Sequence, residues 1–208
     1  MSYTLARPPV RDLRLLRQES KRAFTLIELL AVIAIIALLS AITFGIVKGV
    51  NERAAIGQAK AELSVLAQAL ESYKRQYGDY PQVGTSSALE STASATGQSG
   101  KFFNSLFGKL GPTLTVVAID GKSFIEAAKF SLSSSTALPT SGNKTAVANA
   151  FIDPWGRFYV YAYVSGWSTY RLLSVGPDGK VGDTFNNTTG AITASPNDGV
   201  DNIYSNSN

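Results

Sequence analysis

Acidic side chains gather near the C-terminus in a segment rich in glycine. Four carboxylates lie within 24 residues, Asp178, Asp183, Asp198 and Asp201, and they are interleaved with glycines that include Gly176, Gly179, Gly182 and Gly199. Calcium takes about six to eight hard oxygen ligands, which carboxylates and the carbonyls of a flexible backbone supply. The spacing is not that of an EF-hand, because Lys180 and Gly182 occupy the alternate positions after Asp178. Two interpretations stay open at this point: a Ca²⁺ site, or solvated turns of Asp, Asn and Gly.

A further carboxylate, Glu28, belongs to the apolar stretch near the N-terminus. Residues 29–47 form a run of 19 residues without a charge. As a helix this run would be roughly 28 Å long and could span a bilayer. A carboxylate at membrane depth costs on the order of 2.5–3.5 kcal/mol, so we expect a partner. Cleavage between Ala23 and Phe24 would supply one, a free α-amine close to Glu28. The first helical turn also favours an acidic residue through the helix dipole.

The positive charge of the chain belongs to its first residues. Residues 1–23 hold six Lys and Arg against two Asp and Glu, and the remainder therefore holds 13 of each from totals of 19 and 15. This basic cluster precedes the apolar segment, so residues 1–23 should stay in the cytoplasm and the part after Lys48 should be exported. Because the remainder is balanced, we expect no nucleic acid partner.

Several residue types that support catalysis are missing. The sequence has no Cys and no His, which excludes disulfides and thiolate sites and removes the commonest general base. Gly121-Lys122-Ser123 resembles the end of a P-loop, but Val116 stands where the earlier glycine is required. We therefore expect a structural or binding protein rather than an enzyme.

Three other interpretations of the apolar segment compete: a cleaved secretory signal, a plain signal anchor and a buried core helix. A secretory signal has a shorter apolar region, of roughly 7–15 residues, followed by a small-x-small site. Here the run is longer, and Thr43-x-Gly45 is a weak candidate site. Glu28 within the stretch also argues against all three.

After Lys48 the apolar residues form a stripe with alternating spacings of three and four, which predicts an amphipathic helix: Ile56, Ala59, Leu63, Leu66, Leu70, Tyr73 and Tyr77. Gly78 and Pro81 end it. One helix from about residue 24 to 77 is expected, its second half packed on a sheet.

Residues 82–150 are rich in Ser, Thr, Ala and Gly and predict irregular structure with one or two short helices. Residues 158–164 and 169–175 predict a β-hairpin after the Asp153-Pro154-Trp155-Gly156 turn.

The run from Lys21 to Leu30, KRAFTLIELL, resembles the N-terminal signal of type IV pilins and type II secretion pseudopilins. The resemblance implies that a prepilin peptidase cuts between Ala23 and Phe24 and N-methylates Phe24. It also implies that Glu28 neutralises the amine of a neighbouring subunit during assembly. In this family the residue before the cut is usually Gly rather than Ala, and many members have Pro where this chain has Gly45. The implied fold is α+β and type IV pilin-like, a long helix packed on a small antiparallel sheet.

The later motifs are similar to those of the major, G-type pseudopilins of type II secretion. They are the Asp-Pro-Trp-Gly turn, the Tyr-rich hairpin and the loop Ser174-x-Gly176-x-Asp178-Gly179. The resemblance implies Ca²⁺ in this loop, with Asp178 as a ligand, Asp198 and Asp201 as later acidic ligands, and Asp183 as a less certain one. Residues 185–194 are an Asn/Thr-rich insertion between the acidic clusters.

These expectations divide the chain into five parts. They are a cleaved leader (1–23), the membrane and assembly half of the helix (24–47), its amphipathic half (48–81), a variable region (82–150), and the hairpin with the acidic loop (151–208). The implied role is a subunit of a secretion pseudopilus, anchored in the inner membrane with its C-terminal part in the periplasm. Its implied partners are copies of itself, other prepilin-like subunits, the prepilin peptidase and an inner-membrane assembly platform.

Two alternatives stay open. One is a type IV pilin for adhesion, motility or DNA uptake, although the absence of Cys counts against the many pilins that close their C-terminal loop with a disulfide. The other is a singly anchored periplasmic binding protein that never polymerises.

Overall fold

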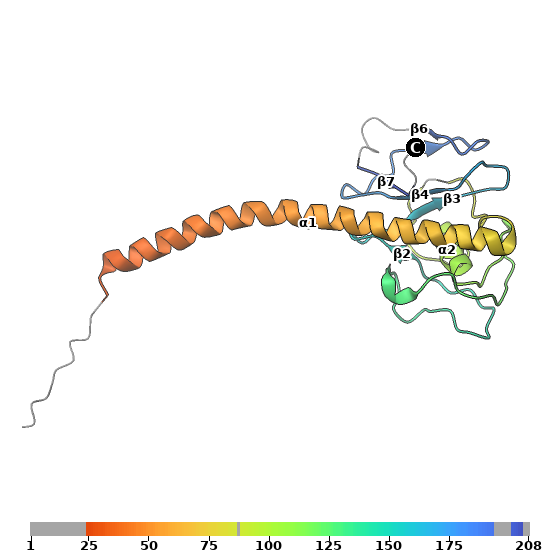
Figure 1. Ribbon diagram of the computed structural model, residues 1–208, viewed down its shortest axis with the longest axis horizontal. Helices are drawn as coiled ribbons and strands as arrows, with labels where there is room; N and C mark the ends of the chain where they lie inside the picture. The colour runs from red at the N-terminus through yellow and green to blue at the C-terminus, as the bar shows by residue number, and fades with distance from the viewer. Residues whose placement is uncertain (1–23, 87, 194–200, 206–208) are drawn as a thin grey trace, which may run out of the picture. The chain divides into compact units, whose positions relative to one another are not determined.

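A computed structural model describes residues 24–86, 88–193 and 201–205, without the side chains of residues 43–48 (Figure 1). The chain forms two compact units, Met1–Val47 and Lys48–Asn208. The first contains the beginning of the long helix α1, and the second contains the rest of α1 together with the other helices and strands.

Helix α1 spans Leu26–Tyr77, 52 residues. The large apolar side chains that the structure describes in the first unit are exposed, with Phe24, just before the helix, 82% exposed and Leu38 64% exposed. The residue after the helix is Gly78, whose positive φ of 84° favours glycine and whose N–H donates to the Lys74 carbonyl at 2.7 Å.

Within the described ranges, the structure contains no helix whose length and hydropathy would let it cross a membrane.

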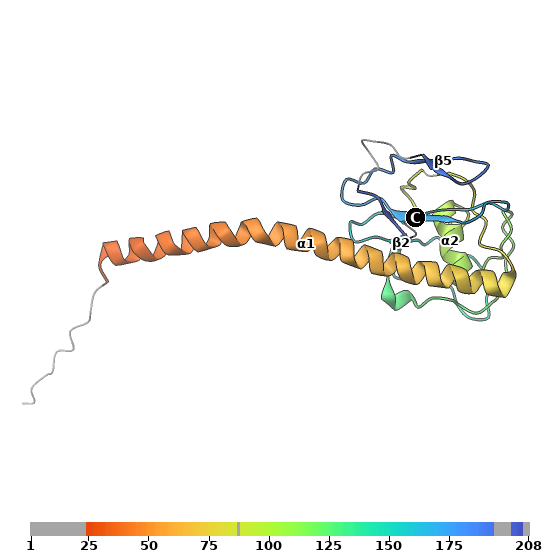
Figure 2. The ribbon, with the colours of Figure 1, turned by 45° about the horizontal axis from the view of Figure 1, so that its top comes forward.

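The apolar stripe predicted for the second half of α1 faces the core of the second unit. Ala59, Leu63, Leu66, Leu70 and Tyr73 are buried, and the partly buried Ile56 and Tyr77 pack against the same cluster. Strands β3 and β4 lie beside this half of the helix in two views (Figures 1 and 2), and their residues belong to the same cluster. The helix therefore has a core on one side, as its spacing requires.

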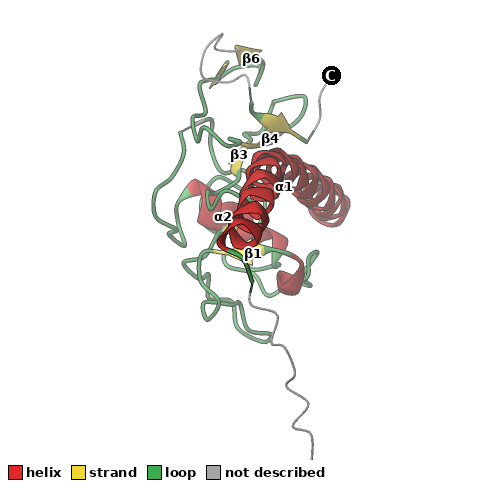
Figure 3. Ribbon diagram, turned by 90° about the vertical axis from the view of Figure 1, so that its left-hand side faces the viewer, coloured by secondary structure: helices red, strands yellow, loops and turns green. Residues whose placement is uncertain are grey.

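Among the described residues, the strands are short and form three antiparallel sheets. Their bounds, with those of the remaining helices, are α2 Gln98–Leu106, the 3₁₀-helix η1 Ala127–Lys129, β1 Ser131–Leu132, β2 Phe151–Ile152, β3 Val160–Ala162, β4 Arg171–Ser174, β5 Thr184–Phe185, β6 Ile192–Thr193 and β7 Ile203–Tyr204. The sheet orders are β1-β2, β3-β4-β7 and β5-β6. In the three-stranded sheet, Tyr161 pairs with Leu172 and Ser174 pairs with Ile203. Figure 3 shows the helices and the short strands coloured by type, with β6 away from α1 and α2.

Tyrosine hydroxyls tie the sheet and loops to α1 and its C-terminal turn. Tyr159 donates to Glu62 Oε2 at 2.7 Å across 97 residues of sequence, and Glu62 is itself buried. Tyr163 donates to Asp79 Oδ1 at 2.7 Å, and Tyr73 donates to the Leu110 carbonyl at 2.8 Å. Burial raises the pKa of the Tyr159 hydroxyl well above its ordinary value, so the phenol remains a donor at every physiological pH.

Buried asparagines organise the loops of the 82–150 region. Asn104 in α2 donates to the Val147 carbonyl at 2.8 Å and accepts from the Val147 N–H at 2.9 Å. Asn149 accepts from Ser133 and donates to the Ser134 and Ala137 carbonyls. Both asparagines are fully buried. Amide side chains thus supply the hydrogen bonds that a sheet ladder would otherwise provide.

The structure confirms the α+β fold class and differs from the sequence prediction in its strands. The hairpin is present as β3 and β4, but each strand is shorter than the predicted run. Strands β1, β2, β5, β6 and β7 were not predicted. Each has only two residues, which is too few to show an alternating pattern.

The buried Tyr159–Glu62 hydrogen bond should contribute to stability. Tyr159→Phe removes one donor from a buried carboxylate, so we expect the free energy of unfolding to fall by about 1–3 kcal/mol. Tyr80→Phe is the matched control, because Tyr80 donates to Glu71, an exposed acceptor that water can reach, and it should cost less than about 1 kcal/mol. Urea denaturation of the full chain in micelles measures both, and equal losses would contradict the assignment.

Candidate functional site

The first turn of α1 holds Glu28 in a capping box. Thr25, the residue before the helix, donates from its N–H and from its hydroxyl to Glu28 Oε2, each at 2.8 Å. The Glu28 N–H donates in return to Thr25 Oγ1 at 3.2 Å. This reciprocal arrangement satisfies N–H groups that the first helical turn leaves without partners. The carboxylate also lies at the positive end of the helix dipole.

The sequence prediction for Glu28 considered a cleaved chain end as its partner, and it missed Thr25. Thr25-Leu26-Ile27-Glu28 is a capping-box pattern directly before an apolar run, which is the signal that could have identified this residue. Of the two residues predicted to flank the cleavage, Phe24 is exposed, and Ala23 lies outside the described residues.

In the second unit, the Asp153-Pro154-Trp155-Gly156 sequence forms a closed turn. The Gly156 N–H donates to the Asp153 carbonyl at 2.9 Å. Asp153 Oδ1 accepts from the N–H groups of Trp155 and Arg157, at 3.1 and 2.9 Å. Asp153 Oδ2 accepts from the Ser174 hydroxyl at 2.7 Å. Since Asp153 and Ser174 are both buried, the turn is fixed to the end of β4, where the acidic loop begins.

Two of the predicted acidic residues meet in the loop. The Asp178 N–H donates to Asp201 Oδ2 at 3.0 Å, and Asp178 Oδ1 accepts from the Lys180 N–H at 2.8 Å. Asp183 is buried, and its Oδ2 accepts from Asn202 Nδ2 at 2.9 Å and from the Tyr204 hydroxyl. Asp198 lies outside the described residues. The structure therefore brings Asp178 to Asp201 and joins Asp183 to the β7 segment.

Asn202 is a candidate ligand that the sequence prediction missed. Its Oδ1 is buried and accepts no hydrogen bond from any residue that the structure describes. Its position next to Asp201 is the signal that could have suggested it, because an amide oxygen is a hard ligand like a carboxylate. Across the described part of the chain, no three His, Cys, Asp or Glu residues form a group that could hold a metal ion. Asp178, Asp201 and Asn202 supply oxygens of the type that Ca²⁺ prefers.

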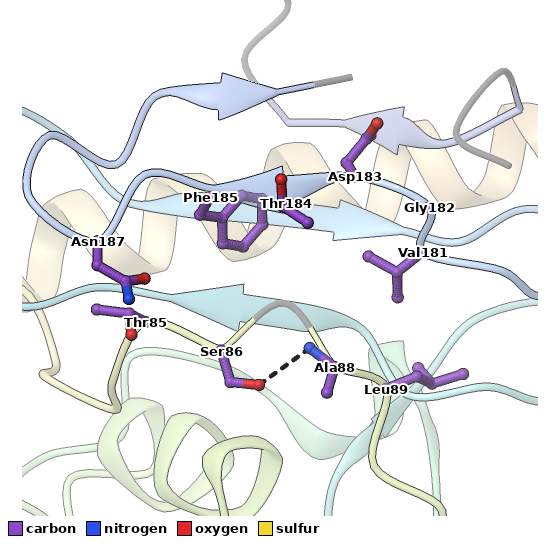
Figure 4. A pocket seen from close by; sticks show the side chains of 10 residues that line it. All are labelled: Thr85, Ser86, Ala88, Leu89, Val181, Gly182, Asp183, Thr184, Phe185 and Asn187. Carbon is purple, nitrogen blue, oxygen red and sulfur yellow. Dashed lines mark hydrogen bonds between the residues drawn. The ribbon is translucent and has the colours of Figure 1, made fainter. Parts of the chain in front are cut away.

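A pocket of about 660 Å³ lies between residues 85–89 and residues 181–187 (Figure 4). Its described lining residues include hydroxyl groups and one ionisable group, Asp183. In Figure 4 Asp183 points away from Ser86 and Ala88, whose hydrogen bond of 3.0 Å shapes the opposite wall. A paired acid and base is not among the described lining residues, so the pocket does not supply the groups for acid–base catalysis.

The capping box predicts how the first turn responds to substitution. Thr25→Ala removes the hydroxyl that bonds Glu28, and we expect the first-turn amides of the uncleaved chain to exchange about 2- to 30-fold faster, equivalent to about 0.5–2 kcal/mol. Thr25→Ser keeps the hydroxyl and is the matched control. Amide hydrogen exchange in micelles measures the difference, and equal rates in the two variants would contradict the capping role.

Comparison with known proteins finds a family match in the N-terminal part of the chain and another in its C-terminal part. Residues 20–44 match the family described as the prokaryotic N-terminal methylation motif, and residues 133–192 match type II secretion system (T2SS) protein G. The chain is 29% identical over 166 residues to the type II secretion system core protein G of Escherichia coli (strain K12), covering 79% of this chain and 87% of that protein. No solved structure matches the chain. The chain therefore resembles type IV prepilin-like proteins and, among them, the G-type pseudopilins of type II secretion systems.

Proposed function

We propose that this protein is a structural subunit of a type II secretion pseudopilus, processed by a prepilin peptidase and polymerised from the inner membrane to drive protein export. The observation that carries the proposal is the pairing of two family matches on one chain. The methylation motif covers Phe24 and Glu28, and the protein G match covers the hairpin and the start of the acidic loop. A non-enzymatic role is part of the proposal.

The proposed placement follows from the charge of the leader. Residues 1–23 carry a surplus of four positive charges and would remain in the cytoplasm. The apolar side chains at the start of α1, exposed in the single subunit, would be covered by lipid before assembly and by other copies afterwards, because an extended apolar surface is unfavourable in water. The second unit would lie in the periplasm.

Glu28 is the proposed assembly residue, and the capping box suggests how it acts. In the uncleaved chain its carboxylate accepts hydrogen bonds from the neutral N–H and hydroxyl of Thr25. Cleavage before Phe24 would create an ammonium group one residue from Thr25. A charged donor binds a carboxylate about twice as strongly as a neutral one. The amine of a neighbouring copy could therefore compete for Glu28 with the Thr25 cap.

The proposed partners are the proteins that cleavage of the leader and assembly of the fibre require. A prepilin peptidase would cut between Ala23 and Phe24 and methylate the new end. An assembly platform in the inner membrane would add subunits, and copies of this chain with other prepilin-like subunits would form the fibre.

Glu28 gives the most direct test. Glu28→Gln removes the charge that would bind the amine, a charge-assisted hydrogen bond of about 1.5–3 kcal/mol, so we expect about a tenfold or greater loss of sheared fibres from cells that carry the secretion system. Glu52→Gln is the matched control, an exposed carboxylate on the same helix. Mass spectrometry should show that both variants still begin at methylated Phe24. Unchanged fibre yield in Glu28→Gln, or a wild-type chain that retains residues 1–23, would contradict the proposal.

We also propose that the acidic loop binds Ca²⁺. The supporting observations are the approach of Asp201 to the Asp178 turn and the buried, unpaired oxygen of Asn202. Asp178, Asp201 and Asp198 would hold the ion, Asn202 would add an amide oxygen, and Asp183 would contribute less directly through its hydrogen bond to Asn202. The bound ion would neutralise the repulsion among these carboxylates and stabilise the C-terminal segment.

Calorimetric titration of the full chain in micelles tests this second proposal. We expect a dissociation constant on the order of 0.1–1 mM, as in extracellular Ca²⁺ modules, and about tenfold weaker binding in Asp178→Asn. Glu126→Gln is the control, because Glu126 is exposed and pairs with Lys129 away from the loop. The absence of binding at millimolar Ca²⁺, or binding that Asp178→Asn leaves unchanged, would end the proposal.

A further inference from the structure

Arg157 follows the Asp-Pro-Trp-Gly turn and reaches the acidic loop. Its Nη1 donates to the Gly176 carbonyl at 3.1 Å. Its guanidinium also lies directly against Gly179, where an added Cβ would be 2.1 Å from Nε and 2.4 Å from Nη2. Gly179 has a φ of 74°, a backbone conformation that favours glycine, and the guanidinium occupies the space that a Cβ would take. Arg157 thus contacts the first and last residues of the Gly176–Gly179 turn.

Asp201 contacts the same turn. A Cβ at Gly176 would be 2.5 Å from the Asp201 carbonyl oxygen and 2.8 Å from Asp201 Oδ2. The Asp178 N–H donates to that same carboxylate oxygen at 3.0 Å. Two residues of opposite charge therefore contact the turn. Arg157 contacts it at Gly176 and Gly179, and Asp201 contacts it at Gly176 and Asp178.

The position of Arg157 is itself fixed by buried groups. Its N–H donates to Asp153 Oδ1 at 2.9 Å, and Asp153 Oδ2 accepts from the Ser174 hydroxyl. The Ser174 Oγ in turn accepts from the Gly176 N–H at 3.2 Å. The backbone at both Arg157 and Gly176 is thus bound to one pair of buried side chains, Asp153 and Ser174.

We propose that Arg157 is a positioning residue that forms the Gly176–Gly179 turn before any cation binds, and so holds Asp178 beside Asp201. Its effect on Ca²⁺ affinity rests on the calcium proposal above, whereas its effect on the turn does not. A planar guanidinium with several donors is suited to fixing a carbonyl while it covers a glycine. A preformed turn lowers the ordering cost of binding, whereas the positive charge of Arg157 opposes a nearby cation. The proposal requires the first effect to be the larger.

Amide hydrogen exchange of the full chain in micelles, in EDTA, tests the positioning role. In Arg157→Ala we expect the Asp178 amide to exchange about tenfold faster, while the amides of β3 and β4 keep their wild-type rates, which shows that the unit remains folded. Arg157→Lys keeps the charge but lacks the planar fork, so it should give an intermediate rate. Arg75→Ala, which removes an exposed arginine of α1, is the matched control.

Titration with CaCl₂ provides the second measurement. Arg157→Ala should bind Ca²⁺ about tenfold more weakly, as is usual when a group that orients metal ligands is removed, and saturating Ca²⁺ should restore slow exchange at Asp178. Tighter binding, or an Asp178 exchange rate equal to wild type, would overturn the inference. If the wild-type chain binds no Ca²⁺, the calcium proposal fails, and the exchange rates in EDTA alone decide whether Arg157 positions the turn.

Discussion

The second half of α1 must cover its apolar stripe, and the rest of the second unit is arranged around that requirement. Leu63, Leu66 and Leu70 lie in one core with residues of β3 and β4. Hydrophobic burial alone does not fix the register of a helix against a sheet with strands of two to four residues. The Tyr159–Glu62 and Tyr163–Asp79 hydrogen bonds join the sheet to α1 and its C-terminal turn, and because hydrogen bonds are directional they also fix the register between them. The acidic loop depends on this packing, because it begins at the end of β4.

The two candidate sites share a physical design in which a carboxylate organises backbone N–H groups. Glu28 accepts from Thr25 at the start of a helix, and Asp201 accepts from Asp178 in a glycine-rich turn. Charge-assisted hydrogen bonds of this type are shorter and stronger than neutral ones. In each case an acceptor that a cation could use is already held by the chain's own donors. A cation that binds either carboxylate would therefore replace hydrogen bonds that the chain already makes to it. It would not bind a carboxylate that had no partner before.

The sequence predicts the parts of this structure that repeat and not those that depend on single contacts. The 3–4 spacing from Ile56 to Tyr77 predicted the buried face of α1, and aromatic and β-branched runs predicted the β3–β4 hairpin. Strand β7 was missed because two residues carry no periodicity, and it forms only where Ser174 and Leu173 offer an edge. Asp178 and Asp201 were predicted as Ca²⁺ ligands from their residue type and from family resemblance. Thr25 was missed although its capping-box spacing to Glu28 is visible in the sequence. The contacts of Asn202 and Arg157 depend on the three-dimensional structure, which no local spacing reveals.

The buried Asn149 has a consequence for how the length of the loop at residues 138–145 can vary among relatives. Its amide binds Ser133, Ser134 and Ala137 and so fixes one end of a loop whose other end is fixed by Asn104 at Val147. Residues 138–145 between these anchors are mostly exposed. Lengthening a loop with fixed ends costs only about 0.6 kcal/mol per doubling. Relatives could therefore lose or gain residues here and present different outer faces along a filament without disturbing the packing beneath.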